Sequence, residues 1–255
     1  MNEDLKPLLQ DWPYDAGEIK VRKITGVDGK EKIQMRIDLG VLQMETRGRP
    51  DGQRPFGYES YYDYQLARLE QHTQDHGISE GFALSFEECS QLRQESLQYY
   101  YRYLSFFYLA DYAGVYRDTE RNLQLFDFVH TYAAEEEDRY LLEQYRPYVV
   151  MMNTRAKAYQ RLNEQHAEEA VDIIIEGINR IKTFFENIGQ SRLAEECNEM
   201  SLLRQMAEEI LRTVPRDPVR DLREEMNAAV AREDYERAAA LRDEIRSMEE
   251  SARSS

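Results

Sequence analysis

Cysteine is scarce in this chain of 255 residues, which contains only Cys89 and Cys197. Two thiols far apart in the sequence do not form the disulfide framework of a small secreted domain, and they indicate a reducing compartment. Each lies among acidic neighbours, which disfavour the reactive thiolate form. We therefore expect neither cysteine to act as a nucleophile.

Long apolar runs are also missing. No stretch approaches the length of about 18 residues that indicates a transmembrane helix. The segment Met1–Lys6 has neither the basic start nor the apolar run of a signal peptide. These absences predict a cytoplasmic protein without a membrane partner.

The motifs that usually mark catalytic or metal sites do not occur in the sequence. It contains no G-x-x-x-x-G-K-[ST] phosphate loop, no paired C-x-x-C zinc motif and no assignable Ser-His-Asp set. His72 and His76 are four residues apart, so a helix would place them on one face, but no third ligand can be assigned. We predict a protein that is not an enzyme, with no catalytic residues, no metal and no cofactor.

Acidic residues dominate the charge. The sequence has 33 Lys and Arg against 49 Asp and Glu, a net charge of −16, which excludes general attraction to nucleic acid or anionic lipid. Residues 18–56 are the exception, with nine basic and six acidic side chains, a net charge of +3. Any direct contact with nucleic acid is therefore expected only from this part of the chain.

The N-terminal region, residues 1–57, reads as β structure. Apolar and polar residues alternate over residues 19–22 and 33–39, on either side of a turn at Asp28-Gly29. This pattern predicts an antiparallel hairpin with one wet face, and the run over residues 41–45 can add a third strand. Because a two-stranded hairpin is marginally stable, we expect it to lie against the helices that follow.

The segment 47–58 reads as a loop, since three glycines and two prolines prevent regular structure. Arg47, Arg49 and Arg54 give it anion-binding chemistry. Three interpretations remain open: a solvated linker whose arginines pair with acidic helices, a site for an acidic protein segment, and a site for nucleic acid.

Residues 58–213 are predicted to be helical. Gly and Pro are rare within the periodic runs, and small and large residues recur at loosely similar offsets of about 48. We interpret the region as tetratricopeptide-like helical hairpins, with a plain helical bundle as the alternative. The segment Tyr99–Tyr116 holds nine aromatic residues and Arg102 as its single cation, and therefore indicates a central core helix rather than a platform for stacked bases.

Two short amphipathic helices are predicted at the C-terminus. Apolar residues recur at three- and four-residue steps over residues 219–230 and again over residues 235–248. Pro218 suits a first helical position, and Asp217 and Asp234 are placed to cap the two helices. Two stripes this short are expected to cover each other.

The sequence pattern of this hairpin, E-D-Y-E-x-A-A-x-L-R-D-E-I over residues 233–245, resembles the UVR motif. That motif is shared by the excinuclease subunits UvrB and UvrC, the kinase activator McsA and the unfoldase ClpC, and it docks proteins without catalysing a reaction. The resemblance covers residues 217–250, so we divide the chain into regions 1–57, 58–213 and 217–251.

The resemblance implies a mainly α (α+β) adaptor that docks a partner carrying a similar hairpin, or a second copy of itself. Its pathway would be nucleotide excision repair or, alternatively, McsA- or ClpC-like protein quality control, and a second alternative is nucleic-acid binding through residues 47–54. Glu244 would help Asp234 and Arg242 to set the register at the rim of the contact. The expected partner-binding residues are Asp234, Tyr235, Ala238, Leu241, Arg242 and Ile245.

Overall fold

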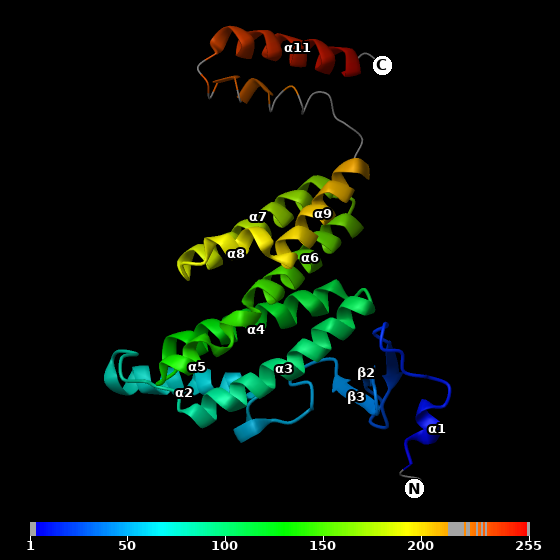
Figure 1. Cartoon of the computed structure of the whole chain (residues 1–255), viewed down its shortest axis with the longest axis vertical. Helices are drawn as coiled ribbons and strands as arrows, with labels where there is room; N and C mark the ends of the chain where they lie inside the picture. The colour runs from blue at the N-terminus through cyan, green and yellow to red at the C-terminus, as the bar shows by residue number, and fades with distance from the viewer. Residues whose placement is uncertain are drawn as a thin grey trace. The chain divides into compact units, whose positions relative to one another are not determined.

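The computed structural model describes residues 4–213, 222, 225–227, 229, 230, 232 and 234–253 (Figure 1). The chain divides into two compact units, Met1–Glu208 and Glu209–Ser255, and each is described below by itself. The division falls earlier than residue 213, where the sequence places the end of the helical region.

The first unit begins with a short helix and an antiparallel sheet of three strands in the order β1-β2-β3. The predicted hairpin is confirmed, and the run over residues 41–45 adds the third strand. Met35 in the central strand pairs with Val21 on one side and Leu42 on the other. The elements are α1 (Lys6–Leu9), β1 (Val21–Thr25), β2 (Glu31–Ile37) and β3 (Gly40–Glu45).

The expectation of one wet face is wrong for the middle of β2, where Lys32 and Gln34 are buried as well as Ile33 and Met35. The Gln34 side chain donates to Gln43 Oε1 at 2.9 Å and accepts from Arg22 Nε at 2.8 Å. The Arg22 guanidinium in turn lies 4.1 Å from the centre of the Trp12 ring. Hydrogen bonding within a polar layer therefore allows this face to be covered as well.

The prediction that apolar residues alternate as far as Leu39 is also wrong, because Leu39 is exposed and is not part of the apolar face. It lies in the turn between β2 and β3, after the alternation of β2 has ended at Ile37.

The helices of the chain end at local signals that the sequence provides. Ser85 accepts from Glu88 N while Glu88 accepts from Ser85 N, a capping box, and Gly77 ends a helix in the left-handed conformation. The elements after the sheet are η1 (Pro55–Gly57), α2 (Tyr61–His76), α3 (Phe86–Tyr108), α4 (Tyr112–Tyr132), α5 (Glu136–Leu141), η2 (Glu143–Tyr145), α6 (Arg146–Asn163), α7 (Ala167–Asn187), α8 (Ser191–Glu196), α9 (Asn198–Thr213) and α11 (Tyr235–Arg253).

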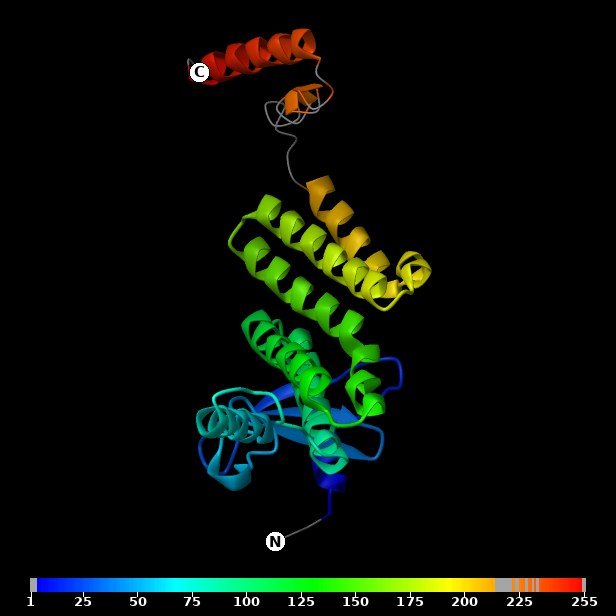
Figure 2. The same cartoon turned by 90° about the vertical axis from the view of Figure 1, so that its left-hand side faces the viewer.

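In the first unit, the long helices pack mainly on their neighbours in sequence: α3 on α4, α4 on α6, and α6 on α7. Figures 1 and 2 show these helices following one another as a stack, with the sheet beside α3. The first and last of these helices, α3 and α7, do not pack on each other as the neighbouring helices do. The helices therefore form an open array rather than a closed bundle. Membership of the tetratricopeptide family remains a prediction.

Two glycines allow the closest helix approaches. A Cβ on Gly114 of α4 would lie 2.8 Å from the Phe106 ring of α3, and one on Gly177 of α7 would overlap the Thr154 side chain of α6. Residues larger than glycine would therefore push neighbouring helices apart.

The aromatic run contributes to the core of α3, where Tyr99, Tyr103 and Phe106 are buried. Its single cation, Arg102, is also buried and does not face solvent. The helix is therefore central, as predicted, but it buries a charge together with its rings.

Candidate docking surfaces

The C-terminal hairpin has a small core of its own. Ala229 from the first helical stretch is buried against Ala238 and Leu241 of α11, and Leu241 has no exposed surface. Leu222 and Met226 pack against this cluster from the side and are partly buried. The two apolar stripes therefore cover each other, as the sequence predicts.

This packing changes the interpretation of the expected partner-binding residues. Ala238, Leu241 and Ile245 are buried within the hairpin and do not form an open apolar seam, because two short helices must bury their own stripes before they can offer any surface. The expectation that these three side chains face a partner is corrected accordingly. Of the apolar residues named from the sequence, Tyr235 alone is exposed, at 66% of its surface.

Val230, which the sequence analysis places on the covered stripe, is also exposed, at 48% of its surface. It precedes the connection between the helices, and Tyr235 follows it. Its helical spacing places it on the apolar stripe, but spacing alone does not show that another side chain covers it. Val230 and Tyr235 are therefore the large apolar side chains that the hairpin exposes beside its connection.

Asp234 holds this connection in place. Its Oδ1 accepts from Arg237 N at 3.1 Å, which confirms the predicted cap, and its own N donates to Ala229 O at 2.9 Å. These bonds fix the end of the first helix against the start of α11. Asp234 thus positions Tyr235, the residue that follows it.

Charged side chains cover the rest of the hairpin surface. Arg237 donates to Glu225 Oε1 at 2.8 Å and so connects the two helices, and the hydrogen bond with Glu225 raises the pKa of Arg237 above its usual value. Arg242 pairs with its neighbour Asp243 at 2.8 Å, and both side chains are largely exposed. Arg242 and Glu244 are both exposed, and their role at the rim of a contact stays a prediction.

The three arginines of the loop 47–58 lie in different environments. Arg49 is largely enclosed and pairs with Asp51 at 3.1 Å and with Glu95 of α3 at 3.5 Å. Arg47 and Arg54 are exposed and make no side-chain hydrogen bond or ion pair with the part of the chain that the structure describes. The structure therefore supports pairing with an acidic helix for Arg49, and it leaves the other two available to a ligand.

Arg102 anchors this loop to the helices. Its Nη1 donates to Gly48 O at 2.6 Å and Glu45 O at 3.1 Å, and its Nε and Nη2 donate to both carboxylate oxygens of Asp118 in α4 at 2.6 and 2.9 Å. Sequence reasoning did not identify this ion pair. A lone Arg within an aromatic run is the signal that points to it, since a buried guanidinium needs a carboxylate.

A second buried carboxylate, Glu95 of α3, holds the start of α2. It accepts from Tyr61 N at 2.7 Å and Tyr62 N at 3.1 Å, and it also pairs with Arg121 and Arg49. The carboxylate caps free amides at a helix N-terminus, where negative charge is favourable. Together with Arg102, it gives the loop and the adjoining helix a fixed position.

An exposed aromatic group lies at the end of the loop. Phe56 has a left-handed backbone with a φ of 53°, and its exposed ring stacks on Tyr64 at 4.2 Å between centroids. Positive φ is strained for a phenylalanine, so the surrounding structure must hold it. This group was not identified from the sequence.

The remaining candidate residues show ordinary structural contacts. The rings of His72 and His76 stack at 4.3 Å, and each ring also contacts a backbone carbonyl. Burial raises the pKa of the Cys89 thiol to about 11, and burial also raises the pKa of Cys197. Within the described residues, no three His, Cys, Asp or Glu side chains gather as a metal site.

The comparisons with known proteins concern the C-terminal hairpin. Residues 217–251 match the family model described as the UvrB/uvrC motif, or UVR. The chain carries a UVR motif. No significant match to the chain was found among curated proteins or among solved structures. The residues forming the UVR hairpin core thus belong to a motif that typically mediates contact between proteins.

Among the described helices, including that of the UVR hairpin, none is both long enough and apolar enough to cross a membrane.

Proposed function

We propose that this protein is a non-enzymatic cytoplasmic adaptor that docks a protein partner through its UVR hairpin. The observation that carries the proposal is the UVR motif on a compact unit of its own, with Tyr235 and Val230 exposed beside the connection. Aromatic side chains that are exposed and held in position are common anchors of protein interfaces. The adaptor role follows from this combination.

The small core of the UVR hairpin supports the same proposal. Units below about 40 residues usually need disulfides, metals or oligomerisation to become stable. Pairing with a second hairpin would cover Tyr235 and Val230 and form a four-helix arrangement. Burial of a few hundred Å² per hairpin at about 25 cal/mol/Å², less the costs of association, corresponds to roughly micromolar affinity.

The proposed pathway is nucleotide excision repair, with an excinuclease subunit like UvrB or UvrC as the partner. Protein quality control, with an unfoldase or a kinase as the partner, is the alternative, because UVR motifs also occur in ClpC and McsA. The high negative charge of the chain favours reaching DNA through such a partner rather than by direct contact.

Affinity capture from the source cells tests the proposal, with three baits: the full chain, a chain ending at Thr213, and Tyr235→Asp. We expect a repair subunit on the full chain, loss of that subunit from the shortened chain, and at least tenfold less of it on Tyr235→Asp. Tyr108→Asp is the matched control, since Tyr108 is an exposed tyrosine of α3. Capture of an unfoldase or kinase would replace repair by quality control, and equal capture by all baits would refute docking through the hairpin.

Arg47, Arg54 and the stacked pair Phe56–Tyr64 favour nucleic acid as a second candidate ligand. Free guanidinium groups in the same loop as the exposed Phe56 ring match the needs of a single strand, whose phosphates pair with cations and whose bases stack. Fluorescence anisotropy with a labelled single-stranded oligonucleotide tests this candidate. We expect salt-sensitive binding that is lost when Arg47 and Arg54 become Gln, and binding retained by that variant would exclude the loop.

A further inference from the structure

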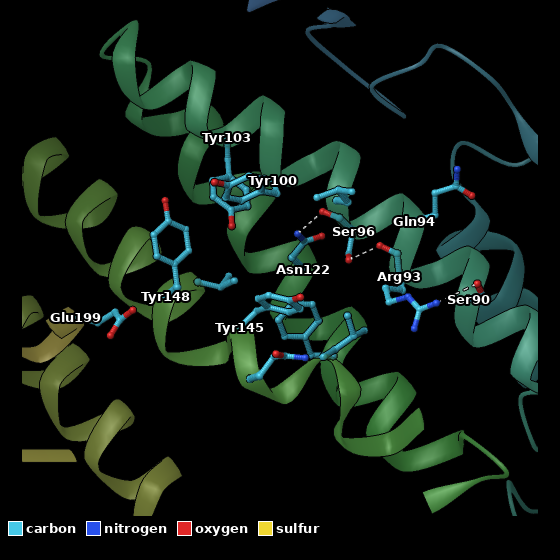
Figure 3. Close-up of a pocket in the computed structure, with 15 residues that line it drawn as sticks. Ser90, Arg93, Gln94, Ser96, Tyr100, Tyr103, Asn122, Tyr145, Tyr148 and Glu199 are labelled. Carbon is cyan, nitrogen blue, oxygen red and sulfur yellow. Dashed lines mark hydrogen bonds between the residues drawn. The ribbon is translucent and has the colours of Figure 1, made fainter. Parts of the chain in front are cut away.

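A groove in the first unit lies between α3 and the N-terminal part of α6. Both helices pack on α4 without packing extensively on each other, so the space between them stays open above Asn122 and Phe126 of α4. Its volume is about 790 Å³, within the range of clefts that hold small ligands. Figure 3 shows side chains from both helices pointing into this space.

One face of α3 forms a long wall of the groove. The lining residues of α3 include Ser90, Arg93, Gln94, Leu97 and Tyr100, spaced at three- and four-residue steps. Three turns of helix separate the first from the last, which corresponds to roughly 15 Å at about 1.5 Å per residue. An extended chain advances about 3.3 Å per residue, so the wall matches a segment of about five residues.

The cation at one end of this wall lacks a carboxylate. Arg93 donates to Ser90 Oγ at 3.3 Å and makes no ion pair with another described residue. Two other arginines of the first unit are paired with carboxylates, Arg102 with Asp118 and Arg146 with Glu143. The groove therefore offers a guanidinium with free donors, which suits a carboxylate ligand.

The opposite end has different chemistry. Figure 3 places Tyr148 and Glu199 away from Arg93, with Tyr100 and Tyr103 nearby. The centroids of the Tyr100 and Tyr148 rings lie 6.0 Å apart. Burial raises the pKa of Tyr148 to about 12, so this end presents neutral hydroxyls beside one carboxylate at neutral pH.

Apolar surface is left uncovered between the two ends. Leu97 on α3 is 48% exposed, and Tyr145, just before α6, is 52% exposed. Both line the groove, and Phe126 and Leu142 add further apolar surface to it. A side chain inserted here would bury apolar area on both walls.

We infer that the groove binds a short extended peptide of a partner protein, with an acidic residue at Arg93 and an apolar side chain between Leu97 and Tyr145. Glu199 disfavours an acidic residue at the far end, so the acidic residue belongs at the Arg93 end. The volume suits a few extended residues and not a helix of several turns, whose diameter is about 10 Å. This site is independent of the UVR hairpin and of the proposed pathway.

Selection from a display library of random peptides on the full chain tests the inference. We expect the selected peptides to share one acidic residue that lies within a few positions of a large apolar residue. A fluorescein-labelled selected peptide should bind Arg93→Glu at least tenfold more weakly than the wild type, as expected for loss of a charge-assisted hydrogen bond. Leu97→Glu should weaken it similarly, since it places a charge on the apolar part of the groove.

Arg54→Glu is the matched control, because it reverses an exposed cation outside the groove and should leave affinity within twofold. A peptide whose acidic residue is replaced by Lys should recover binding to Arg93→Glu, which a merely structural role of Arg93 would not produce. Circular dichroism of each variant confirms folding. Selection without the acidic-apolar pattern, unchanged binding by Arg93→Glu, or equal loss in Arg54→Glu would overturn the inference.

Discussion

Arg102 and Asp118 show how single residues tie the loop of residues 47–52 to the helical array. Both side chains are 1% exposed, and the guanidinium makes two hydrogen bonds to the carboxylate, one to the loop carbonyl of Gly48 and one to the carbonyl of Glu45 at the end of β3. Water cannot replace these contacts once one partner is removed. The pair therefore serves less as a source of net stability than as a constraint whose loss is costly.

Replacing Asp118 by Asn should lower the free energy of unfolding by about 3–5 kcal/mol, because a buried guanidinium loses its counter-charge. Denaturation by urea measures the change. Arg242→Ala is the control, since its exposed pair with Asp243 should contribute no more than about 1 kcal/mol. Similar small losses in both variants would show that Arg102 gains another partner or becomes hydrated.

Cys89 gives a prediction about pH. Burial raises the pKa of its thiol to about 11, so the folded chain keeps the proton where the unfolded chain, with a thiol pKa near 8.5, begins to lose it. The contribution of Cys89 to stability is therefore fully present below about pH 8.5. It is lost as the pH rises through about 11.

Alkylation of Cys89 by iodoacetamide in the folded chain should be negligible at pH 8, and the urea-unfolded chain should react readily. Mass spectrometry of the peptide containing Cys89 measures both rates. Equal rates in the folded and unfolded chain at that pH would contradict the buried, protonated thiol.

At the scale of elements, sequence periodicity predicts the sheet, the helical middle region and the UVR hairpin. The offset of about 48 joins Phe126 of α4 to Ile174 of α7, and both residues are buried. It does not extend to Ala110, which lies in an exposed turn, although Ala158 is buried. Periodicity reports which residues face inward, but it does not report what covers them.

Two features that the sequence did not predict depend on contacts between distant parts of the chain. The covering of Gln34 depends on Gln43, Arg22 and Trp12, which come from different parts of the chain. The groove beside α3 depends on two helices that share a third without meeting each other. Local patterns contain no information about such distant neighbours.

Gly177→Ala tests the contact between α6 and α7. The added Cβ would overlap the Thr154 side chain, and overpacking of this kind should lower the free energy of unfolding by about 1–3 kcal/mol. Gly40→Ala is the control, because a Cβ there has no atom within 4 Å and the backbone is not left-handed. Equal stability of the two variants in urea would show that α7 can shift at little cost.

At the scale of the whole molecule, the UVR hairpin belongs to the second of the two units, so we predict that it adds little to the stability of the first unit. The buried residues of α9, Met200, Leu203, Met206 and Ile210, all precede Thr213. A chain ending at Thr213 therefore keeps this helix complete. It removes the hairpin core of Ala229, Ala238 and Leu241.

The main melting temperature of the chain ending at Thr213 should lie within about 3 °C of that of the full chain. A change of 1 kcal/mol in the free energy of unfolding shifts the melting temperature of a chain of this size by about 2–4 °C. Differential scanning calorimetry measures the shift, and sedimentation velocity on the same samples measures self-association. We expect any self-association to disappear with the hairpin, because Tyr235 and Val230 leave with it. A fall of about 10 °C or more would show that the hairpin stabilises the first unit. Self-association that persists in the shortened chain would show that the contact between copies does not depend on the hairpin.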